Sequence, residues 1–92
     1  MPGGLNILRI KLMPESPSAD LNKMKADAES TVKKVGGIFN GSIEEPIAFG
    51  LNALIITAGL KEDRSPELLE TELAKIEHVQ SVEVIDVRRA FG

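Results

Sequence analysis

Few side chains in this sequence could carry out covalent chemistry. His78 is the only imidazole, and with Ser81 and Asp86 it could on paper form a Ser-His-Asp triad. Such a triad also needs a strained nucleophile turn and donors for an oxyanion, and no segment with that pattern accompanies these residues. We therefore expect no enzyme activity. His78 is interpreted as a surface residue at the end of the second helix, where the helix dipole favours a protonated imidazole.

Metal and nucleotide sites are not predicted either. Glu44 and Glu45 are adjacent, and neighbouring residues of a strand point to opposite faces, so the two carboxylates cannot share a ligand. The chain contains neither GxxxxGK[ST] nor GxGxxG, the two common phosphate-binding patterns. Gly36 and Gly37 are interpreted as the end of a helix. We expect no cofactor and no metal.

Two features are typical of binding to another molecule. Phe49 lies in the segment PIAFG, and it is one of only three Phe in a chain without Trp or Tyr. Between Pro46 and Gly50 it suits either a core aromatic that anchors a loop or an exposed anchor for an interface. Arg88 and Arg89 either add solubility or reach into an acidic or phosphate-binding cleft on a partner.

Composition limits the classes of function. The 92 residues carry a net charge of −3 and no Cys, which predicts a single domain, residues 1–92, held together by packing. The acidic balance and the scarcity of aromatic residues disfavour direct nucleic-acid binding. Neither a leader nor a stretch that could span a membrane is expected, so we predict a soluble, cytoplasmic protein.

Alternation and helical spacing predict the elements of the first half. Residues 5–13 alternate between apolar and basic side chains, which indicates a strand with one wet face. A helix follows, capped by Ser18 or Asp20, and it has an apolar stripe. That stripe is Leu21, Met24, Ala28, Val32 and Val35.

The remaining elements follow from apolar runs and turn residues. A strand is predicted over 38–45, where Asn40-Gly41-Ser42 suits a bulge or an edge position, and it ends at Pro46. A central strand covers 51–60, and residues 61–64 form a solvated turn. Ser65-Pro66-Glu67 begins a second helix. The buried stripe of this helix is Leu69, Leu73 and Ile76. A last strand is predicted over 80–88, with Val82 and Val84 on one face and Ile85 and Val87 on the other.

The order β-α-β-β-α-β predicts an α+β fold. Right-handed crossovers and pairing of neighbouring strands fold this order into a ferredoxin-like split βαβ sandwich. It has a four-stranded antiparallel sheet with two helices on one face, and the other face is left open for a partner.

Three segments resemble the archaeal elongation factor 1-beta family, which is similar to the C-terminal guanine-exchange domain of the eukaryotic factor. They are LMPES at 12–16, EEPIAFGLNAL at 44–54 and HVQSVEVIDVRR at 78–89. The resemblance extends over nearly the whole chain and implies a guanine-nucleotide exchange factor. Its partner would be elongation factor 1-alpha, from which it would release GDP so that GTP can bind during translation elongation.

The resemblance also implies site residues. The eukaryotic relatives carry an aromatic that docks on the GTPase within a P-x-G-[FY]-G-I segment, and PIAFG aligns with it. This places Phe49 at that position, between Pro46 and Gly50. A lysine near the end of those relatives reaches toward the magnesium site of the GTPase, and Arg88 and Arg89 lie there in this chain.

Another class of function is consistent with the predicted fold. Ferredoxin-like domains also serve as regulatory modules that bind a small ligand between paired domains, but only the fold supports that alternative. Such a module would dimerise and show ligand-dependent melting, whereas an exchange factor would accelerate the release of GDP from its partner.

Overall fold

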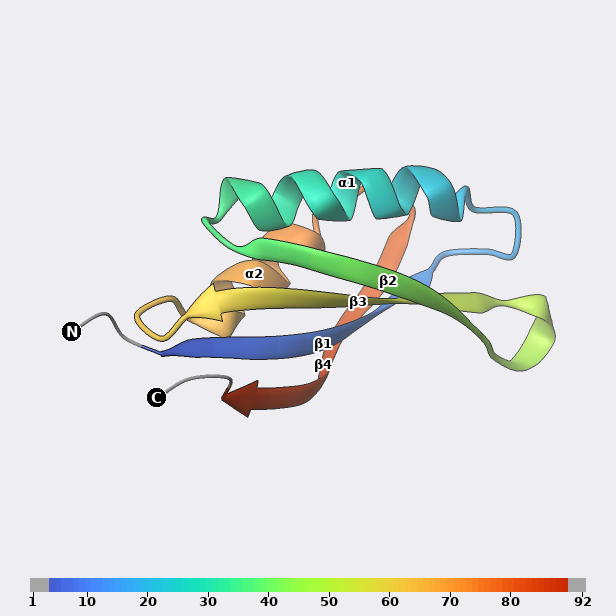
Figure 1. Cartoon of the computed structure of the whole chain (residues 1–92). Helices are drawn as coiled ribbons and strands as arrows, with labels where there is room; N and C mark the ends of the chain where they lie inside the picture. The colour runs from blue at the N-terminus through green and yellow to red at the C-terminus, as the bar shows by residue number, and fades with distance from the viewer. Residues whose placement is uncertain (1–3, 90–92) are drawn as a thin grey trace.

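The computed structural model describes residues 4–89, which form a sheet and two α-helices (Figure 1). The order β-α-β-β-α-β is confirmed, and each predicted strand lies within a residue or two of its predicted bounds. The elements are β1 Leu5–Pro14, α1 Leu21–Lys34, β2 Ile38–Pro46, the 3-10 turn η1 Ala48–Gly50, β3 Asn52–Lys61, α2 Pro66–Leu73 and β4 Val79–Arg89.

The four strands form one antiparallel sheet in the order β2-β3-β1-β4. Both helices cover the same face of this sheet, so the predicted α+β ferredoxin-like fold is confirmed (Figure 1). The molecule is elongated along the strands, with extents of 47 × 21 × 18 Å. No helix within residues 4–89 is long and apolar enough to cross a bilayer.

The core lies between the helices and the inner face of the sheet. Alternate residues of β1 and β3 point into it, as the two-residue period of a strand requires. Full burial of a Leu or Ile side chain stabilises a fold by about 1.5–3 kcal/mol, so this layer is the main source of stability. The largest fully buried side chains are Leu8, Ile10, Leu12, Met24, Leu54, Ile56, Leu60, Leu69, Leu73 and Val32.

Both helices begin at a capping side chain. Asp20, and not Ser18, caps α1, because its Oδ1 accepts a hydrogen bond from the Lys23 N–H at 3.1 Å. The Ser65 hydroxyl accepts from the Glu67 N–H at 3.2 Å at the start of α2. Each cap satisfies a first-turn amide that lacks a partner within its helix. Gly36, with φ of 84°, follows the end of α1 as predicted.

The second helix is shorter than its apolar spacing predicts. It ends at Leu73, so buried Ile76 lies in the following turn and not on the helix. His78 is therefore not a helix-end residue, and it adopts a left-handed φ of 72°. Its carbonyl accepts a hydrogen bond from the Glu15 N–H at 2.9 Å, which joins this turn to the end of β1.

Register shifts change the faces of the edge strands. In β2 the register with β3 shifts between Phe39 and Ser42, as predicted. In β4 the register with β1 shifts at Ile85, because Arg9 lies opposite Asp86 while Ile10 lies opposite Val84. The extra residue moves Val87 to the face of Val84, opposite buried Leu8. The prediction that Ile85 and Val87 share the other face was wrong, since strict alternation fails at a bulge.

Candidate functional site

The turn between β2 and β3 presents Phe49 to solvent. Its side chain is 94% exposed, the largest exposure among the large apolar residues at 4–89. This excludes the interpretation of Phe49 as a core aromatic. Pro46 and Gly50, which flank it, are also exposed, and the hairpin extends beyond the helices at the right of Figure 1. These three residues lie together, and we name Pro46–Gly50 the hairpin tip.

Local hydrogen bonds and backbone angles hold the hairpin tip in shape. Pro46 pairs with Asn52 and ends the ladder. The Ile47 N–H donates to the Leu51 carbonyl at 2.7 Å, which closes the turn. Phe49 and Gly50 both have positive φ, 62° and 74°. Glycine adopts this region freely, but for Phe it costs about 1–2 kcal/mol. Backbone strain of this kind is concentrated at functional sites.

Arg88 and Arg89 end the described part of β4, and they point to opposite faces of the sheet. Arg88 lies opposite Ile7, whose own partner Gly59 belongs to the open face. Arg89 lies opposite Asn6, whose partner Leu60 is buried beneath the helices. The pair is therefore two separate cations and not one doubly charged patch.

Each arginine has a different carboxylate partner. Arg88 Nε lies 2.9 Å from Asp86 Oδ2, two residues earlier in the same strand. Arg89 Nη2 forms an ion pair with Glu62 Oε2, across the sheet in the turn after β3. Glu62 Oε1 accepts a hydrogen bond from the Gly4 N–H at 3.0 Å. The sequence prediction missed Glu62, because it assigned residues 61–64 to a solvated turn and gave no sign of a partner so distant in the chain.

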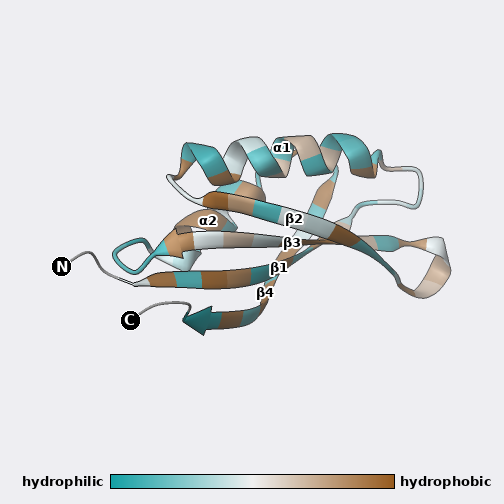
Figure 2. Ribbon diagram, in the orientation of Figure 1, coloured by the Kyte–Doolittle hydropathy of each residue, from teal (hydrophilic) through white to brown (hydrophobic). Residues whose placement is uncertain are grey.

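The hairpin tip and the arginine end lie at opposite ends of the molecule. Across the sheet, Arg89 is level with Leu60 at one end of β3, and the hairpin tip begins level with Asn52 at the other end of β3. At about 3.3 Å per residue, these two positions along β3 are roughly 25 Å apart. Figure 2 shows apolar to neutral colour at the β2–β3 turn and a hydrophilic end on β4. The predicted site residues thus lie at two separate ends of the molecule and not in one patch.

The open face of the sheet contains a hollow of about 280 Å³ over the β2 bulge. It is lined by Arg9 of β1 and by Ile55 and Thr57 of β3, together with residues of β2. Ile43 and Ile38, which flank the bulge, are 56% and 59% exposed. The lining residues are Arg9, Asn40, Gly41, Ser42, Ile43, Ile55 and Thr57.

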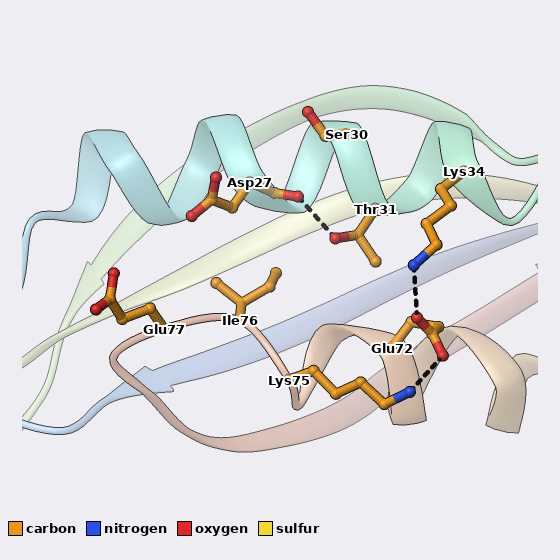
Figure 3. A pocket seen from close by; sticks show the side chains of 8 residues that line it. All are labelled: Asp27, Ser30, Thr31, Lys34, Glu72, Lys75, Ile76 and Glu77. Carbon is orange, nitrogen blue, oxygen red and sulfur yellow. Dashed lines mark hydrogen bonds and ion pairs between the residues drawn. The ribbon is translucent and has the colours of Figure 1, made fainter.

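A second hollow, of about 340 Å³, separates α1 from α2 and is lined mainly by charged side chains (Figure 3). Glu72 accepts hydrogen bonds from Lys75 at 2.9 Å and from Lys34 of α1 at 3.3 Å. These two bonds hold the pKa of Glu72 below its usual range, Lys75 having the larger effect. At the other end of α1, Lys23 pairs with Glu77 at 2.8 Å, and this contact lowers the pKa of Glu77. The hollow is bridged by the protein's own ion pairs, which we interpret as structural.

We expect Glu72→Gln to lower the melting temperature at neutral pH, and the difference from the parent to shrink under acid. A carboxylate whose pKa is lowered by folding adds stability only while it is ionised, so its contribution is lost as the pH falls below about 4.5. Thermal melts at pH 7 and pH 3 test this. Glu70→Gln, which removes the same charge from the same helix, is the control, and a Glu72 effect independent of pH would contradict the assignment.

The side chains considered for metal or imidazole chemistry lie on different elements of residues 4–89. They hold no group of three or more His, Asp or Glu side chains placed to bind a metal ion. His78 Nδ1 lies 3.4 Å from Glu15 Oε1, whereas Ser81 and Asp86 lie further along β4. Glu44 and Glu45 point to opposite faces, since their partners are Leu54 of the core and Ala53 of the open face.

Comparison with known proteins gives consistent matches. A family model described as "EF-1 guanine nucleotide exchange domain" matches residues 7–90. The elongation factor 1-beta of Methanosarcina barkeri is 39% identical over 82 residues, which cover 88% of this chain and 92% of that protein. The elongation factor 1-beta of Methanosphaera stadtmanae is 42% identical over 81 residues, covering 87% and 90%.

A third relative is similar over an even larger share of both chains. The elongation factor 1-beta of Methanocaldococcus jannaschii is 34% identical over 85 residues, which cover 91% of this chain and 96% of that protein. In each case nearly the whole length of the relative is matched, and the range of the family model includes both the hairpin tip and all of β4.

Proposed function

This chain belongs to the elongation factor 1-beta family of guanine-nucleotide exchange domains, and we propose that it acts by direct contact with elongation factor 1-alpha. It is a guanine-nucleotide exchange factor of translation elongation, which promotes the exchange of GDP for GTP on that partner. A cytoplasmic location follows from such a partner. The family match over residues 7–90 is the observation that carries this function.

We assign the contact with the partner to the hairpin tip and the arginine end. Exposed aromatic and arginine side chains are the residue types that most often dominate a protein interface. Phe49, flanked by Pro46 and Gly50, supplies the aromatic, and its 94% exposure leaves the ring free to be buried by a partner. Arg88 and Arg89 supply cations about 25 Å away along the sheet.

The mechanism needs no bond to be broken by this chain. Translation GTPases hold GDP through a lysine-bearing phosphate loop and a bound magnesium ion. An exchange factor accelerates release by binding the nucleotide-free form more tightly than the GDP-bound form. By linkage, a thousandfold loss of GDP affinity needs a coupling free energy of about 4 kcal/mol. A cation near the magnesium site and an aromatic buried by the partner would each contribute to that coupling.

The proposed function predicts faster release of labelled GDP. Elongation factor 1-alpha loaded with mant-GDP is mixed with excess unlabelled GDP, with and without this chain. We expect the release rate to rise at least tenfold, and catalytic amounts of the chain to suffice. A GTPase from outside translation, loaded in the same way, is the control. An unchanged rate with a folded excess of this chain would contradict the proposal.

A further inference from the structure

The hollow over the β2 bulge is lined by Arg9, a cation that forms no ion pair with any carboxylate of residues 4–89. We propose that this hollow receives an acidic side chain, Asp or Glu, of elongation factor 1-alpha, and that Arg9 and Thr57 bind its carboxylate. The inference rests on the proposed exchange function and adds a contact on the open face of the sheet, between the hairpin tip and Arg88.

The bulge explains why the sheet is hollowed at this place. It sets two residues of β2, Asn40 and Gly41, opposite the single residue Thr57 of β3, and neither of the two has a partner in the ladder. An extra residue of this kind bends its strand and interrupts the pairing. The hollow of about 280 Å³ lies at this interruption, and Arg9 of β1, directly opposite Thr57, also lines it. A recess therefore lies beside a charged side chain.

The polar side chains of the hollow are not used within the described part of the chain. Asp86 lies opposite Arg9 in the ladder, but its carboxylate accepts from Arg88 at 2.9 Å instead. Among residues 4–89, the side chains of Asn40 and Thr57 form no hydrogen bond either. A guanidinium, an amide and a hydroxyl are all donors, and an ionised carboxylate is a pure acceptor that suits such a set.

The hollow is also partly apolar, which favours a side chain over a free anion. Ile55 belongs to its lining and is 3% exposed, while Ile43 beside it is 56% exposed. The methylene groups of a Glu or Asp would cover Ile43 while the carboxylate reaches Arg9, and this burial of apolar surface adds to the binding free energy. A free phosphate ion would leave Ile43 in water.

The open face is where a partner in contact with both ends of the sheet is expected to lie. Helices α1 and α2 cover the other face (Figure 1). Along β3, Thr57 lies between Asn52, where the hairpin tip begins, and Gly59, which is level with Arg88. A partner that bridges these positions covers the hollow. Burial of Arg9 without an acceptor would carry the cost of its desolvation, so a partner that fits supplies an anion there.

Release of mant-GDP from elongation factor 1-alpha tests the contact. We expect Arg9→Met to raise the concentration of this chain needed for half-maximal release at least tenfold. The rate at saturation should stay the same, because the ion pair holds the partner and does not act on the nucleotide. Arg9→Glu should raise that concentration further, since two carboxylates would then meet. Thr57→Val, which keeps the shape but removes the hydroxyl, should raise it about threefold.

The control is Lys25→Met, which removes an exposed positive charge from α1. It should leave both the half-maximal concentration and the saturating rate at the values of the parent. Arg9 is exposed as well, so Arg9→Met should melt close to the parent; if it does not fold, Arg9→Gln gives the same comparison. Added NaCl should raise the half-maximal concentration of the parent more steeply than that of Arg9→Met, because salt screens the ion pair.

Three results would overturn the inference. The first is an unchanged half-maximal concentration for both Arg9→Met and Arg9→Glu. The second is a loss confined to the saturating rate, which would place Arg9 at the nucleotide and not in a docking contact. The third is a dimer of this chain, detected by sedimentation, that Arg9→Met dissociates, because the hollow would then belong to a second copy. Failure of the unmodified chain to accelerate release would instead reject the exchange function itself.

Discussion

Replacement of Phe49 by Ala should raise the concentration of this chain needed for half-maximal GDP release by a factor of about 30. That factor corresponds to about 2 kcal/mol, the loss typical of an aromatic anchor at the centre of an interface. The melting temperature should stay the same, because a side chain that is 94% exposed contributes almost nothing to the core. Titration of the chain against mant-GDP-loaded partner, together with a thermal melt, measures both quantities.

Phe49→Gly makes the same test sharper, because the activity should fall while the stability should not. Glycine removes the strain of the left-handed φ of 62°, so this variant should melt no lower than the parent while it loses the contact. Leu68→Ala is the matched control, since Leu68 is also an exposed apolar residue, on α2. A large drop in melting temperature with normal exchange per folded molecule would return Phe49 to a structural role.

Replacement of Gly37 by Ala should destabilise the fold by about 1–3 kcal/mol through overpacking. A Cβ atom at Gly37 would lie 2.9 Å from the Gly59 carbonyl oxygen and 3.0 Å from side-chain atoms of Leu60 and Val32. The carbonyl belongs to the central strand and cannot move aside without disturbing the ladder. In a domain of this size the melting temperature should fall by roughly 10 °C.

Gly59→Ala is the control for Gly37→Ala within the same contact. Its Cβ would meet only the end of the Leu5 side chain, at 3.5 Å, which is an ordinary van der Waals distance. We expect this variant to melt close to the parent. Urea unfolding of both variants, compared at equal m values, distinguishes a packing clash at residue 37 from the general effect of replacing a glycine by alanine. Equal destabilisation of the two would contradict the clash.

The element order could be predicted because each boundary has a local cause. Two prolines end β1, Ser65 and Pro66 start α2, and the glycines after α1 end that helix, so these boundaries depend on nearby residues alone. The side of Val87 could not be predicted, because a bulge in β4 becomes visible only in its pairing with β1. Local periodicity carries no information about an extra residue in a ladder.

The types of the residues that we propose bind the partner could be predicted, but their surroundings in the fold could not. Phe49 stood out because aromatic residues are scarce in this chain. Its apolar neighbours were consistent with either a buried or an exposed ring, and only the geometry of the turn decides between these two positions. Arg88 and Arg89 stood out as a pair. Their separation onto two faces follows from strand alternation, whereas Glu62 approaches Arg89 only through the register of three strands.

The long axis of the sheet has a mechanical consequence. Hydrogen-bonded strands resist stretching, so the distance between the backbone of the hairpin tip and the backbone at the end of β4 is nearly constant from one molecule to the next. A partner can bind both ends at once only in conformations whose two binding sites are separated by the same distance as the hairpin tip and the end of β4. Simultaneous engagement therefore selects those shapes from the partner's ensemble, and the length of the strands determines which of them gain population.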